Sequence, residues 1–95
     1  MDFKFEDAPE TACFVCNHVF AKERPTLYVT HDQEDGFWSF LCGHDDHPND
    51  EDYKIISLKQ ATAIDERINE LYEMPLGIGA ERQTAAADWE AFKLP

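Results

Sequence analysis

The chain has 95 residues, 43% of them hydrophobic and 13% aromatic, a composition that predicts one folded domain over residues 1–95. Twenty acidic residues against eight basic ones give a formal net charge of −12. This charge excludes nucleic acid and anionic membranes as partners, because both are bound through Lys and Arg. No apolar run is long enough for a membrane span, and the first ten residues lack a secretory signal. We therefore expect a cytoplasmic protein with reduced cysteines.

The first half of the chain contains the patterns of β-strands. Residues 11–20 alternate imperfectly between apolar and polar types, and residues 26–32 alternate clearly. The turn-rich segment that follows leads into the aromatic residues 36–43, so residues 26–42 are predicted to form an antiparallel pair. The sequence YKIIS, residues 53–57, predicts a fourth strand.

An amphipathic helix is predicted to follow directly. Ser57 and Gln60 have the spacing of a capping box, which marks a helix start. Apolar residues then recur at steps of three and four, which gives the helix one buried stripe. The stripe consists of Leu58, Ala61, Ile64, Ile68, Leu71 and Tyr72. Met74-Pro75 is predicted to end the helix, because proline cannot donate to the helical hydrogen-bond ladder.

The last twenty residues predict one more strand and a short helical turn. Residues 76–84 contain two glycines for bends and read as a closing strand, and residues 85–92 read as a helical turn that buries Trp89 or Phe92. Several strands with one helix and no regular βαβ alternation predict an α+β fold. We expect a mostly antiparallel sheet of four to five strands, with the main amphipathic helix packed on one face.

The cysteines offer a candidate zinc site. Cys13 and Cys16 have the C-x2-C spacing by which two thiolates grip one ion from a tight turn, and Cys42 with either His44 or His47 would complete a Cys3His tetrahedron. The site requires a turn at residues 13–16, because in a regular strand Cys13 and Cys16 would point to opposite faces. Three buried, reduced cysteines that pack as small hydrophobes are the alternative. A thioredoxin-type redox pair fits less well, since no helix is predicted to start at this motif.

The acidic segment around residues 45–52 offers oxygen ligands for calcium. It lacks the glycine at the sixth position and the register of an EF-hand loop, so a solvated loop with a turn at Pro48-Asn49 is the preferred interpretation. The chain has four histidines, but it lacks the motifs in which they could act as catalytic residues: a nucleophile elbow, an H-E-x-x-H motif and a phosphate-binding glycine loop. We therefore expect a protein that is not an enzyme and has no catalytic residues.

Four segments of the chain together resemble a known family. They are the CxxC-containing first strand, LYVTHDQEDGFWSFLCG, DHPNDEDYKIISL and PLGIGAER. They are similar to a family of small uncharacterised bacterial proteins that looks related to polymorphic-toxin immunity proteins. The resemblance covers about residues 11–90, and its matching positions are Trp38, Gly43, Asp45, Asp46, Pro75, Gly77, Glu81 and Arg82.

The resemblance implies an α+β fold and a non-catalytic protein that binds and blocks a toxin. Such a protein would use its acidic loops, residues 32–35 and 45–52, to complement a basic cleft on its partner, because complementary charge speeds association. We therefore expect an immunity-like module that binds a basic protein. The alternative hypothesis is a small zinc-binding protein with a structural Cys3His site.

Overall fold

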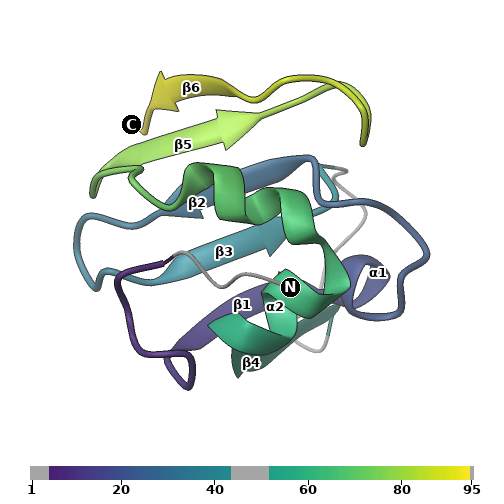
Figure 1. Ribbon diagram of the computed structural model, residues 1–95, viewed down its shortest axis with the longest axis horizontal. Helices are drawn as coiled ribbons and strands as arrows, with labels where there is room; N and C mark the ends of the chain where they lie inside the picture. Colours follow the sequence, from purple (N-terminus) through teal and green to yellow (C-terminus); the bar gives the residue numbers. More distant parts are fainter. Residues whose placement is uncertain (1–4, 44–51, 95) are drawn as a thin grey trace.

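A computed structural model describes residues 5–43 and 52–94 of the chain. It contains a six-stranded sheet in the order β4-β1-β3-β2-β5-β6, with helices packed against one side (Figure 1). The elements are β1 (Ala12–Cys16), α1 (Asn17–Phe20), β2 (Tyr28–His31), β3 (Trp38–Leu41), β4 (Tyr53–Ser57), α2 (Leu58–Ile64), the 3-10 helix η2 (Glu66–Leu71), β5 (Ile78–Glu81) and β6 (Glu90–Lys93).

The predicted α+β class is confirmed, but the sheet is larger and more mixed than expected. It has six strands rather than four to five, and β1 pairs in parallel with β3. The other neighbours are antiparallel, including the predicted pair β2 and β3, in which Val29 lies opposite Phe40. Residues 85–92 do not form a helical turn, because Glu90–Lys93 pair with β5 as an edge strand.

The main helix starts where the sequence predicts and breaks earlier than expected. Ser57 Oγ accepts from the Gln60 amide, and the Gln60 side chain accepts in return from the Ser57 amide, which completes the capping box. The predicted continuous helix to Met74 is wrong. Asp65 adopts an extended conformation that ends α2, and its carboxylate accepts from the Arg67 amide to start η2.

The core lies between the sheet and the two helical segments. Trp38 and Phe40 of β3 pack there with Leu58 of α2 and Ile68 of η2, and all four are at most 2% exposed. Each such side chain stabilises the fold by roughly 1.5–3 kcal/mol through burial. Tyr72, which the apolar stripe included, remains 39% exposed just beyond the end of η2.

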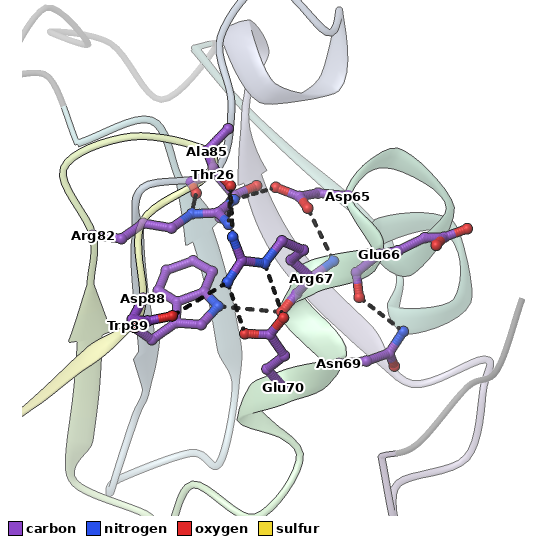
Figure 2. A network of polar contacts seen from close by, with 10 residues as sticks. All are labelled: Thr26, Asp65, Glu66, Arg67, Asn69, Glu70, Arg82, Ala85, Asp88 and Trp89. Atoms are coloured by element: carbon purple, nitrogen blue, oxygen red, sulfur yellow. Dashed lines mark hydrogen bonds and ion pairs between the residues drawn. The ribbon is translucent and has the colours of Figure 1, made fainter.

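A buried arginine ties the end of β5 to the break between the helices. Arg82 donates to the Thr26 and Ala85 carbonyl oxygens at 2.9 and 3.0 Å, and to Asp65 Oδ2 at 2.6 Å (Figure 2). Its guanidinium also lies over the Trp89 ring, 4.2 Å from the centroid. This set of contacts explains why the chain bends at Asp65: its backbone N–H bonds to the Ala61 carbonyl at the end of α2, while its carboxylate accepts from the Arg67 amide at the start of η2 and from Arg82.

Within the described ranges, no helix is both long enough and apolar enough to cross a bilayer.

Candidate metal centre

The parallel pairing of β1 and β3 places two of the cysteines side by side at the carboxyl ends of these neighbouring strands. Phe14 lies opposite Ser39 and Val15 opposite Phe40, so both strands end side by side (Figure 1). Cys16 is the last residue of β1, and Cys42 directly follows β3. Both thiols are fully buried at 0% exposure. Two cysteines that are 26 positions apart in the sequence therefore meet because of a long-range strand pairing.

A short helix adds a histidine to this pair. The predicted strand over residues 11–20 ends at Cys16, whose backbone is still extended, and α1 begins at Asn17. His18, in the first turn of α1, is thereby brought beside the two thiols. One ligand atom from each of Cys16, His18 and Cys42 lies within 4.8 Å of the other two, which makes them a group that could hold a metal ion.

Arg24 is in contact with this group from the loop after α1. Its Nη1 donates to Cys42 Sγ at 3.6 Å and lies 3.3 Å from His18 Nδ1. To bind a metal ion, His18 needs a ring nitrogen with a free lone pair, and a nitrogen that accepts a hydrogen bond from Arg24 does not offer one.

The surroundings of Cys16 act on its thiol in opposite directions. Burial raises the pKa of Cys16, and the neighbouring Cys42 thiol raises it further. The backbone amides of Val19 and Cys42 oppose this change, because they lower the pKa by favouring the thiolate. Without a cation the thiol form is favoured, whereas a bound metal ion would deprotonate it.

The same turn contains a buried oxygen atom without a partner. Asn17 Oδ1 has no hydrogen-bond partner among the residues that the structure describes. Buried polar atoms are nearly always paired, and an exception points to a bound water or ion. No described contact places this oxygen on the group of Cys16, His18 and Cys42, and a buried water would satisfy it.

Cys13 does not belong to the group. It lies inside β1, is 1% exposed and packs in the hydrophobic core. Residues 13–16 form a strand instead of the turn that the C-x2-C hypothesis required. Burial raises the pKa of the Cys13 thiol to about 12, so it stays protonated at neutral pH. A one-turn helix does start directly after the pair, with Cys16 as its N-cap, but Cys13 lies within the strand and not at that helix N-terminus.

Of the five predicted ligands, the structure brings Cys16 and Cys42 together, and His44 and His47 lie outside the described residues. Sequence reasoning missed His18. The signal that could have found it is the C-x-H spacing of Cys16 and His18, since a turn directly after the cysteine lets both side chains face one ion.

The acidic residues near Asp32 have a local role in the β2–β3 turn. Asp32 Oδ1 accepts from the Glu34 amide at 3.0 Å, and Asp35 Oδ1 accepts from the Phe37 amide at 2.9 Å. Such bonds are typical of Asp in turns. Residues 45–51, to which the calcium hypothesis and the second acidic loop refer, lie outside the described part of the chain.

No family model, curated protein or solved structure matches the chain. The relationship to immunity proteins thus stays a prediction. The chemistry of the described residues offers two sulfur ligands and one imidazole, a donor set that suits a borderline-soft cation such as zinc.

Proposed function

We propose that the protein is a small non-catalytic domain that holds a structural zinc ion through Cys16, His18 and Cys42. The observation that carries this proposal is the convergence of their three ligand atoms within 4.8 Å. The ion would fasten the ends of β1 and β3 to α1. Metal binding would thereby contribute free energy to folding, as it does in other small zinc domains.

The donor set favours zinc over harder cations. Two thiolates and an imidazole suit zinc, whereas calcium and magnesium take oxygen ligands. In a tetrahedral site with Zn–S bonds of about 2.3 Å, ligand atoms lie roughly 3.8 Å apart, so the group needs only a small contraction. The full burial of Cys16 and Cys42 favours a structural ion over a catalytic one, which needs an open position.

A structural zinc ion takes a fourth ligand. We propose that His44 or His47 supplies it. Either histidine would give a Cys2His2 site with a net charge of zero, instead of the Cys3His site predicted from the C-x2-C motif.

Arg24 would act as an outer-shell partner of the ion. Its hydrogen bond to Cys42 Sγ would continue after metal binding, when the sulfur becomes a thiolate and a stronger acceptor. Outer-shell hydrogen bonds of this kind orient ligands and raise metal affinity. The alternative is that the cluster consists of inert buried thiols, for which Arg24 has only a packing role.

The test is the zinc content of tag-free protein, measured by native mass spectrometry on wild type and single variants. We expect one zinc per wild-type chain and loss of that zinc in Cys16→Ser, Cys42→Ser and His18→Gln. Cys13→Ala is the matched control, because it removes a buried thiol outside the group and should keep the ion. A wild-type chain without zinc, or zinc retained in Cys16→Ser, would contradict the proposal.

A second role is that of an immunity-like module that binds a basic protein. It is favoured by the formal net charge of −12 and by the resemblance of the chain to toxin immunity proteins. A zinc ion that stabilises the fold is compatible with this role, since neither depends on the other.

A further inference from the structure

One face of the sheet carries an apolar surface that none of the described helices covers. α2 and η2 pack on the same side of the sheet, and α1 lies at the ends of β1 and β3 (Figure 1). Because side chains alternate along a strand, the neighbours of the core residues point to the opposite side. This open face is defined by Phe14, Tyr28, Leu41, Tyr53, Ile55 and Phe92.

The apolar part of the open face is continuous and hollowed. Phe14 lies directly opposite Ile55 across β1 and β4. With Ser39, Leu41 and Tyr53 they line a hollow of about 350 Å³. Ile55 is 66% exposed and Tyr53 is 38% exposed. Single exposed apolar side chains are ordinary, but a contiguous apolar patch marks an interaction surface.

The other end of the open face is acidic. Glu81 lies opposite Tyr28 on β2 and opposite Glu90 on β6, and both carboxylates are exposed. Like charges directly across a sheet destabilise it, so this pair has a cost that a cationic partner would relieve. By strand register, no Lys or Arg of the six described strands points to this face.

The charge of the chain selects among possible occupants. A second copy would bring another −12 and another Glu81–Glu90 pair against the first, which disfavours self-association. A nucleic acid is excluded on the same ground. We propose that the open face binds a basic protein, with an apolar side chain of the partner in the hollow at Ile55 and its Arg or Lys side chains at Glu81 and Glu90.

This inference rests on the proposed binding role and not on the zinc site: Cys16 lies opposite Tyr53 across β1 and β4, but none of Cys16, His18 and Cys42 lines the hollow. It gives the predicted basic partner a defined surface, in which aromatic side chains supply apolar contact area and carboxylates supply charge complementarity.

The experiment is site-specific photocrosslinking in the cells from which the chain comes. The photoreactive residue p-benzoylphenylalanine replaces Ile55 on the open face or, as a matched control, Ala63, an exposed residue of α2. We expect the Ile55 position, and not Ala63, to capture a protein of net positive charge. That protein, once purified, should bind the wild-type chain with an affinity that falls as salt rises.

Two variants then test the two halves of the surface with the purified partner. Ile55→Ala should weaken binding about tenfold or more by removing the apolar contact. The double variant Glu81→Gln and Glu90→Gln should weaken it and reduce its salt dependence. Capture of a second copy, capture of an acidic protein, or no capture would overturn the inference. Capture from Ala63 alone would keep a protein-binding role and reject the open face.

Discussion

Two polar clusters of this protein each contain an arginine, yet they differ in what they assemble. At Arg82, one buried cation meets one carboxylate and two carbonyl oxygens, so positive and negative groups are matched (Figure 2). At Cys16, His18 and Cys42, three electron-pair donors converge with Arg24 at their side. The first cluster needs only the folded chain, whereas the second has the composition of a metal site. The comparison teaches that burial alone does not mark a functional site, and that the balance of donors and acceptors does.

The difference between the two clusters is tested most strongly by removing zinc or one of its sulfur ligands. Because the apparent binding free energy of structural zinc is on the order of 10 kcal/mol, we expect a chelator to cause the largest loss of stability of any change considered. Denaturant unfolding with and without chelator measures the effect. Cys42→Ser should be less stable than wild type and insensitive to the chelator, because it has no ion to lose. An unchanged wild-type unfolding midpoint after chelation argues against the zinc site.

Removing the cation of the other cluster should be costly without involving metal. Arg82→Leu removes the Arg82 donor from Asp65 Oδ2 and from the Thr26 carbonyl oxygen, whereas the Ala85 carbonyl keeps a hydrogen bond from Arg67, and we expect a loss of about 3 kcal/mol in the free energy of unfolding. The loss should be equal with and without chelator. Arg67→Gln is the comparison variant: Arg67 shares the Ala85 carbonyl with Arg82, but its ion pair with Glu70 lies at the surface, so its removal should have a smaller effect. A zinc-dependent effect of Arg82→Leu would mean that the two clusters are coupled.

Alkaline pH distinguishes the core thiol from the metal ligands. Cys13 has a folded pKa of about 12 against an ordinary value of 9.0, so the fold favours its neutral form. This preference contributes fully to the free energy of unfolding below pH 9. The contribution is lost as the pH rises towards 12, because the unfolded chain then loses the thiol proton first, and the loss is about 2 kcal/mol at pH 10.5. Unfolding free energies of wild type and Cys13→Ala, compared from pH 8 to 11, measure this loss. The difference between the two proteins should shrink as the pH rises, and a constant difference would show that Cys13 does not titrate in this way.

The smallest expected effect concerns Arg24. Removing its hydrogen bond to Cys42 in Arg24→Gln should lower zinc affinity about tenfold, at the lower end of what outer-shell changes cause. Competition with a chromophoric chelator measures the affinity. Lys22→Gln, an exposed change on the same loop, should leave it unaltered. Equal affinities in wild type and Arg24→Gln would assign Arg24 a packing role only.

Local sequence patterns predict much of the fold. The prediction errors arise where contacts between residues far apart in the sequence determine the structure. Alternation predicts β2, aromatic residues beside a turn predict β3, the segment YKIIS predicts β4, and the Ser57–Gln60 capping box predicts the start of α2. The break at Asp65 was not predictable from the apolar stripe, because it depends on Arg82, seventeen residues further on. β6 was predicted as helix, since AAADWEAF is rich in helix formers and only pairing with β5 makes it a strand.

The candidate site was half predictable for the same reason. The sequence identifies Cys16 and Cys42 as ligand candidates, but the C-x2-C spacing draws Cys13 into the set. Only the parallel pairing of β1 with β3 shows which cysteine meets Cys42. Only the start of α1 at Asn17 shows that His18 joins them. Neither parallel pairing nor a one-turn helix leaves a strong local pattern in a sequence.

X-ray absorption spectroscopy of the zinc-loaded protein tests the central claim most directly, because it counts the sulfur atoms on the ion. Coordination by Cys16, His18 and Cys42 predicts two Zn–S bonds of about 2.3 Å, with the remaining ligands nitrogen or oxygen at about 2.0–2.2 Å. The spectrum should be unchanged in Cys13→Ala. Three sulfur ligands would place Cys13 on the metal, and a zinc ion without sulfur ligands, or no bound zinc, would contradict the site altogether.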